Sequence, residues 1–125
     1  MKLLEGKTVL KLEKFFFDKN KSIVTAAIAL ELDKVVDAVS RFPQLRLKIE
    51  THTDSRGSNT SNKKLSQRRS DAIKMYLLKN GLSSSNIVES IGLGEEKIKN
   101  NCTNGVYCLD FLHKQNERTL VEVVD

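Results

Sequence analysis

The chain has 125 residues, a mass of 14.1 kDa and a net charge of +5, a size that suits one compact domain. Hydrophobic residues make up 39% and charged residues 30%, which excludes collagen, low-complexity disorder and a disulfide-dense miniprotein. The longest apolar runs, 15–17 and 26–30, are far shorter than the roughly 20 residues of a membrane helix. We therefore expect no membrane insertion by this domain.

The basic balance, with a pI near 9.3, makes nucleic acid a partner to consider. Charges of opposite sign alternate along the sequence, as they do over 11–19, and form no basic block. This pattern is typical of a solvated surface, so no nucleic-acid partner is expected. The opening residues 1–7 lack the apolar stretch of a signal peptide, which leaves a cytoplasmic protein or a piece of a longer exported chain.

The first part of the chain predicts a strand and a helix. Residues 7–17 alternate in part and predict a strand whose apolar side carries Leu10, Leu12 and Phe16. The next apolar residues step by four, three and four positions, the spacing of one helical face: Ile28, Leu32, Val35 and Val39. Either Ser22 or Thr25 is the expected N-cap of this helix, and Pro43 ends it.

A second strand and a second helix follow. Leu45, Leu47 and Ile49 alternate with charged residues, which predicts a strand with one buried face. Residues 51–62 carry no large apolar side chain and predict a loop. From about Ser61 apolar residues return at helical spacing, and Gly81 is the expected stop.

The last third of the chain predicts a short strand over 87–91, a long polar connection over 92–115 and a final strand over 120–124. The two strand–helix–strand crossovers imply a mixed sheet with both helices packed on it. The predicted fold class is α+β, a two-layer sandwich of a mixed four-stranded sheet and two main helices.

The loop 52–57 joins the second strand to the second helix, a place where loops carry binding groups on a rigid support. On the helix, Asn62, Ser66 and Arg69 lie at i, i+4 and i+7 and share one face, and the chain entering that helix passes Asp54. A carboxylate and a guanidinium are thus expected across a small polar hollow. They suit a zwitterionic amino-acid head, whose ammonium binds a carboxylate and whose carboxylate binds the fork of Arg.

The same residues have plainer interpretations. Asp54 forms only an Asx turn in one of them, and Arg69 pairs only with a nearby acid such as Asp71 or Glu50. His52 is expected as a side chain at the end of the strand and not as a catalyst, because no Ser or Cys nucleophile is arranged with it.

Cys102 and Cys108 are the only cysteines of the sequence. The Asn-Gly pair between them favours a turn that could join the two sulfurs, but two free thiols remain an alternative. Their spacing is not usual for zinc, and a calcium loop that began at Asp54 would carry Leu65 where Glu is needed. We predict no metal site and no cofactor.

Two long motifs resemble the OmpA-like, peptidoglycan-binding domain family. Residues 49–57 (IETHTDSRG) and 62–70 (NKKLSQRRS) resemble the family pattern H-T-D-x-x-G followed by N-x-x-L-S-x-x-R-[AS]. Shorter segments, 17–22, 30–36, 92–95 and 116–118, resemble the family as well. The resemblance implies the OmpA-like β-α-β-α-β-β order, with residues 1–125 as a single domain from the C-terminal part of a longer exported protein.

The resemblance also implies a function: noncovalent, non-catalytic binding of peptidoglycan through the meso-diaminopimelate residue of the stem peptide, which anchors the outer membrane to the cell wall. Matched residue by residue, Asp54 accepts the ammonium of diaminopimelate and Arg69 holds its carboxylate. The other implied ligand-binding residues shape the pocket, its walls or its floor: Thr53, Asn62, Leu65, Phe17, Asp18, Asn20 and Arg118. The implied location is the periplasm, with attachment to the outer membrane through a parent chain or lipid anchor not present here.

The segment 102–108 with His113 resembles members from Bacteroidetes-type bacteria, where the cysteines are expected to be bridged. This implies a Cys102–Cys108 disulfide. One position departs from the family: Glu117 replaces the first Arg of the usual N-R-R. Because Arg118 keeps the matching place, we expect Glu117 to point outward. An Arg-to-carboxylate contact would also make refusal of an amidated stem peptide the expected outcome.

Two other functions compete with wall binding. One is a protein-interaction scaffold of the same fold, since a fold does not define a function. The other is an enzyme that uses Cys102 with His113, which we do not expect because no nucleophile and base are in reach. Pairing of two copies into a homodimer is left open.

Overall fold

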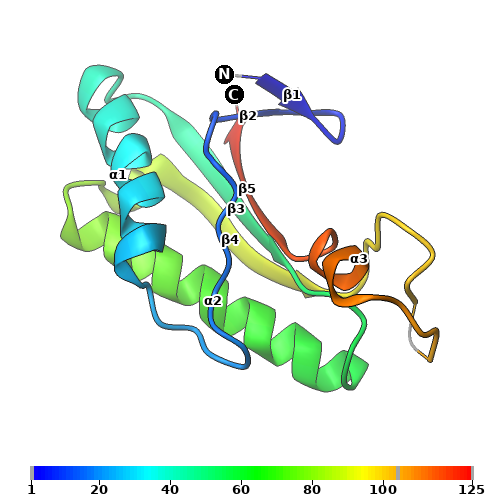
Figure 1. Ribbon diagram of the computed structural model, residues 1–125. Helices are drawn as coiled ribbons and strands as arrows, with labels where there is room; N and C mark the ends of the chain where they lie inside the picture. The colour runs from blue at the N-terminus through cyan, green and yellow to red at the C-terminus, as the bar shows by residue number, and fades with distance from the viewer. Residues whose placement is uncertain (1, 104, 125) are drawn as a thin grey trace.

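In the computed structural model, which describes residues 2–103 and 105–124, two long helices cover one face of a mixed sheet (Figure 1). The strands of the described residues pair in the order β1-β2-β5-β3-β4, with β3 parallel to β4 and antiparallel to β5. The α+β sandwich with its mixed sheet is confirmed, and a short strand, β1, extends the expected four. The elements are β1 (Lys2–Leu4), β2 (Lys7–Val9), α1 (Ala26–Arg41), β3 (Arg46–His52), α2 (Asn59–Lys79), the 3-10 turn η1 (Ser84–Asn86), β4 (Ile87–Gly94), α3 (Asp110–Lys114) and β5 (Arg118–Val124).

Helix α1 begins at the second of the two expected caps, Thr25, whose hydroxyl accepts a hydrogen bond from the amide of Ile28 at 3.4 Å. Its predicted apolar face is buried in the core against Leu47 and Ile49 of β3. Burial of one such side chain contributes roughly 1.5–3 kcal/mol, so this face accounts for the docking of α1 on the sheet. Among the described residues no helix has the length and apolar character of a membrane span.

Helix α2 lies directly on β4, and glycine makes this contact possible. A Cβ at Gly92 would stand 2.1 Å from the backbone nitrogen of Gln67, which no side chain tolerates. Gly94 has a φ of +56° and approaches the backbone of Lys63. The prediction that residues 92–94 belong to a loop is therefore wrong, because they extend β4. The two glycines carry no side chain, which lets α2 pack closely on this end of the strand.

The expected first strand is wrong beyond Val9. Strand β2 covers only Lys7–Val9, and residues 10–25 run to α1 without regular structure. As strand alternation does not continue, Phe16 is exposed, whereas Phe17 is buried and Phe15 packs against the core. The polar connection also contains a short helix, α3, that we had not predicted.

The face of β3 opposite the helices is covered too, which corrects the expectation of one buried face. Glu50 and His52 are each 1% exposed. Lys7 of β2 donates to Glu50 at 2.5 Å. In the turn before β2, Glu5 accepts two hydrogen bonds, at 2.7 and 2.8 Å, from the guanidinium of Arg118. We call these five residues the back cluster.

Candidate functional site: a polar hollow at the end of β3

A hollow of about 460 Å³ opens where β3 runs into α2. Asp54 and Arg69, the two residues on which the sequence prediction centres, both line it. Most of the other predicted ligand-binding residues line it as well: Phe17, Asn20, Thr53, Asn62 and Leu65. The structure thus brings residues of three separate segments to one cavity.

Asp54 leaves the end of β3 and is 5% exposed. Its carboxylate forms an Asx turn by accepting the backbone amide of Arg56 at 2.8 Å, so the turn that we considered for this residue exists. The side chain of Arg56 also donates to the second oxygen of Asp54, from Nε at 3.0 Å and from Nη2 at 2.7 Å. Its Nη1 donates to Asp110 of α3 at 2.7 Å. Arg56 therefore links two acids at the edge of the hollow.

Arg69 is buried in the middle of α2, and its guanidinium is held by neutral groups. Nε donates to the carbonyl of Lys21 at 2.9 Å and Nη2 to the carbonyl of Asp18 at 3.2 Å. The guanidinium lies 5.1 Å from the ring centroid of Phe17, a cation–π distance. Within the described residues it forms no ion pair with Asp71 or Glu50, so that plainer interpretation is wrong. Among residues 2–103 and 105–124, no direct salt bridge compensates its charge.

Asn62 fastens the loop that carries Asp54. Its amide nitrogen donates to the carbonyls of Asp54 and Arg56, at 3.2 and 3.0 Å, and to Glu95 at 3.0 Å. The hydroxyl of Thr53 donates to the carbonyl of Asp54 at 2.9 Å. These bonds hold the loop 53–57 in one shape beside the hollow.

Two of the predicted residues lie outside the lining. Asp18 faces the site only through its carbonyl, which accepts the bond from Arg69. Arg118, at the start of β5, belongs to the back cluster and also donates to the carbonyls of Asn116 and Lys97. It borders a smaller space next to Phe17 and Arg69, beneath the hollow. The part that these two residues take in ligand binding stays a prediction.

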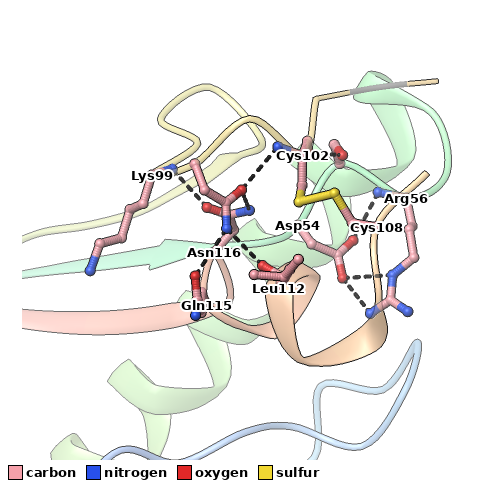
Figure 2. The surroundings of a disulfide bond; sticks show 10 residues. Asp54, Arg56, Lys99, Cys102, Cys108, Leu112, Gln115 and Asn116 are labelled. Carbon is pink, nitrogen blue, oxygen red and sulfur yellow. Dashed lines mark hydrogen bonds and ion pairs between the residues drawn. A yellow bond between two sulfur atoms is a disulfide. The ribbon is translucent and has the colours of Figure 1, made fainter. Parts of the chain in front are cut away.

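The disulfide between Cys102 and Cys108 is present, with the two Cα atoms 6.0 Å apart. Asn104 of the expected Asn-Gly turn lies outside the described residues, but the amide of Val106 donates to the carbonyl of Thr103 at 3.1 Å. Figure 2 shows the disulfide close to Asp54 and Arg56. The hydroxyl of Ser55 donates to the carbonyl of Cys102, which joins this segment to the loop 53–57.

Five further residues line the hollow, although the sequence did not predict their side chains there: Lys19, Arg56, Asp110, Lys114 and Glu117. Asp110 and Lys114 come from α3, inside the predicted polar connection 92–115. Only the position of Arg56, two residues after Asp54, offered a signal, because an Asx turn brings that amide back to the carboxylate. Within the described residues no group of three His, Cys, Asp or Glu side chains could hold a metal ion.

Glu117 does not point outward as expected: it lines the hollow with Asp54 and Arg69. Its side chain is 20% exposed and lies 4.0 Å from the ammonium of Lys114. Burial raises the pKa of Glu117, and the negative charge of Asp54 raises it further, against the opposing charges of Lys114 and Arg69. The turn between α3 and β5 places Glu117 beside the hollow. A tertiary contact holds this turn: the side chain of Asn116 accepts from the amide of Lys99 at 2.7 Å and donates to the side chain of Asn100 at 3.0 Å.

Comparisons with known proteins agree with this architecture. Residues 16–106 match the OmpA family. Outer membrane porin F of Pseudomonas fluorescens is 36% identical over 81 residues, which are 65% of this chain and 24% of that protein. The peptidoglycan-associated lipoprotein of Buchnera aphidicola is 32% identical over 96 residues, 77% of this chain and 51% of the lipoprotein. The chain thus spans about half, or less, of the length of these curated relatives.

Solved structures share the fold at lower identity. The peptidoglycan-associated lipoprotein of Burkholderia pseudomallei superposes with a TM-score of 0.72 at 24% identity, covering 94% of this chain and 90% of that one. The C-terminal domain of Helicobacter pylori MotB gives a TM-score of 0.74 at 14% identity, covering 92% and 86%. Since the family match extends over most of the sequence, the chain belongs to the OmpA family.

Proposed function

We propose that this domain binds peptidoglycan noncovalently and without catalysis, by gripping the meso-diaminopimelate residue of the stem peptide. The observation that carries the proposal is that Asp54 and Arg69, of opposite charge, line one hollow. The names of curated relatives, a peptidoglycan-associated lipoprotein and an outer membrane porin, support a role at the cell wall in the periplasm. In this proposal a parent chain or lipid anchor outside residues 1–125 supplies the attachment to the outer membrane.

Arg69 is prepared for a ligand carboxylate. Its contacts with Phe17 and with two backbone carbonyls fix the plane of the guanidinium, and neither contact neutralises its charge. A fixed guanidinium loses little side-chain freedom when it binds a carboxylate with two parallel hydrogen bonds. The carboxylate of diaminopimelate would therefore lie against Arg69.

Asp54 receives the ligand ammonium after its own partner has made room. Arg56 covers the carboxylate, but the side chain of Arg56 is 46% exposed and can move into solvent. The backbone amide of Arg56 stays on the first oxygen, so Asp54 keeps its orientation while its second oxygen accepts the ammonium. Arg56 thus occupies the ammonium position in the free protein and competes with the ligand.

The remaining predicted residues shape the cavity. Asn62 and Thr53 hold the loop of Asp54, Leu65 and Asn20 line the walls, and Phe17 supports Arg69. One zwitterionic head buries little apolar area, so we expect an affinity on the order of micromolar to millimolar for a free stem peptide. Many copies acting on the polymer would strengthen binding by avidity.

The test is sedimentation of the domain with purified sacculi. We expect the wild-type domain to pellet and the variants Asp54→Ala and Arg69→Ala to remain in solution while keeping a folded circular dichroism spectrum. The matched controls are Arg68→Ala, the exposed neighbour on α2, and Asp37→Ala on the exposed side of α1, which should pellet like wild type.

Arg69 also anchors the segment 18–21, so a second variant guards against local unfolding. Arg69→Lys keeps the positive charge but loses the planar fork, and we expect it to fold and to bind weakly. Pelleting of Asp54→Ala and Arg69→Ala at the wild-type level would refute the site. A folded wild-type domain that ignores sacculi would refute wall binding and favour the protein-interaction scaffold.

A further inference from the structure

Glu117 stands out among the acids of the hollow because its carboxylate lacks hydrogen-bond donors. The two oxygens of Asp54 accept three bonds from Arg56, and Asp110 accepts one from the same side chain. Within residues 2–103 and 105–124, the carboxylate of Glu117 accepts none, and its nearest cation, Lys114, is 4.0 Å away.

This arrangement is costly in the free protein. A largely buried carboxylate without donors has lost part of its hydration and gained little in return. Asp54 adds a second negative charge to the same cavity. This charge disfavours the ionised carboxylate of Glu117, whereas the positive charges of Lys114 and Arg69 favour it. A ligand cation placed between the two acids would remove the penalty.

The ligand of the proposed function carries such a cation. The side-chain ammonium of diaminopimelate has three donors, and Arg56 already holds Asp54. An ammonium that enters the hollow can therefore divide its donors between the two acids, and Glu117 offers the oxygens that are not already engaged.

We infer that Glu117 is a specificity-determining residue of this site: it binds the ligand ammonium together with Asp54, and it reduces the advantage that a stem peptide with a free carboxylate has over an amidated one. This inference rests on the proposed function. The effect follows from charge. The lining of the cavity contains both cations and acids, which attract and repel a ligand carboxylate bound at Arg69. The negative charge of Glu117 therefore lowers the gain that a free carboxylate has over a neutral amide. A neutral amide still accepts hydrogen bonds from Arg69 and avoids the repulsion. The inference weakens the refusal of amidated peptides expected from the Arg contact alone.

The experiment compares two synthetic stem peptides that differ only in the side-chain end of diaminopimelate, one a free carboxylate and one an amide. Binding of each is measured by isothermal titration to wild type, Glu117→Gln and Glu117→Arg. We expect wild type to bind both peptides. In Glu117→Gln the amidated peptide should lose about tenfold in affinity, the usual value of one hydrogen bond to a charged group.

The free-acid peptide should lose less in Glu117→Gln, because removal of the charge also removes its repulsion. The ratio of the two affinities should therefore move several-fold toward the free acid, and further in Glu117→Arg. Asp37→Asn is the matched control, since Asp37 is an exposed acid on α1 outside the lining of the hollow, and its ratio should equal that of wild type.

The outcomes separate this inference from the proposed function. An unchanged affinity ratio in Glu117→Gln, with wild-type binding intact and Asp54→Asn inactive, would overturn the role of Glu117 and leave wall binding standing. A wild-type domain that binds neither peptide would overturn the proposed function, and this inference with it.

Discussion

The back cluster and the hollow are both rich in charge, but they differ in how that charge is compensated. In the back cluster, Glu5 meets Arg118 and Lys7 meets Glu50 in direct ion pairs, and His52 lies 3.4 Å from Glu50. In the hollow, within the described residues, Arg69 has no direct salt bridge and the carboxylate of Glu117 accepts no hydrogen bond.

The difference indicates what each region does. In a set of charges that is satisfied internally, the removal of one partner destabilises the fold, and few interactions are left for a ligand. A guanidinium without a direct salt bridge and a carboxylate without hydrogen-bond donors can still bind a ligand. In the free protein, both lower the stability of the fold. We therefore expect changes in the back cluster other than at Arg118, which stays a predicted ligand-binding residue, to alter stability alone. Changes in the hollow should alter binding, even where they stabilise the fold.

The largest expected effect is a loss of stability in acid that depends on His52. Burial, with the nearby charge of Arg118, lowers the pKa of His52 from 6.5 to about 4, against the opposing effect of Glu50. The unfolded chain thus takes up a proton at higher pH than the folded one. Stability is full above pH 6.5 and falls as the pH drops toward 4, by about 3 kcal/mol for the complete shift.

Urea unfolding across that pH range measures this loss, and His52→Gln should flatten it. The control is Gln44→Ala, an exposed change at a residue without a titratable group, which should leave the slope in place. If His52→Gln lost stability toward acid as steeply as wild type, His52 would not be the source of this pH dependence.

A smaller loss is expected for Glu5→Gln. The amide keeps the shape of the side chain but leaves the guanidinium of Arg118, which is 7% exposed, with only neutral acceptors. We expect a fall of about 2 kcal/mol in the free energy of unfolding at pH 7, measured in urea. Pelleting with sacculi should not change. Loss of pelleting by a fully folded Glu5→Gln would break the distinction between the two regions.

The smallest effect has the opposite sign and belongs to the hollow. The pKa of Glu117 is raised in the folded state, chiefly by burial, so the ionised form costs stability. This cost is absent below the unfolded pKa and appears as the pH rises through the folded one. Glu117→Gln should therefore be slightly more stable than wild type at pH 7, with no difference at pH 3 in thermal unfolding, although it binds the amidated peptide less well. If Glu117→Gln were less stable than wild type at pH 7, the charge of Glu117 would stabilise the fold, as the charges of the back cluster do.

Much of this molecule is determined by local spacing in the sequence. The apolar steps from Ile28 to Val39 define the buried face of α1, and the motif around Asp54 with the helical position of Arg69 predicts their common cavity. Such predictions succeed because a helix or strand converts residue spacing directly into a direction in space.

Only the tertiary structure decided the rest. Phe17 and not Phe16 enters the core because residues 10–25 have no regular repeat. His52 and Glu50 are buried by a hairpin about 45 positions earlier in the chain. Glu117 turns into the hollow at a junction between α3 and β5. In each case the direction of a side chain depends on segments distant in sequence, and the free energy of their packing is not contained in any local pattern.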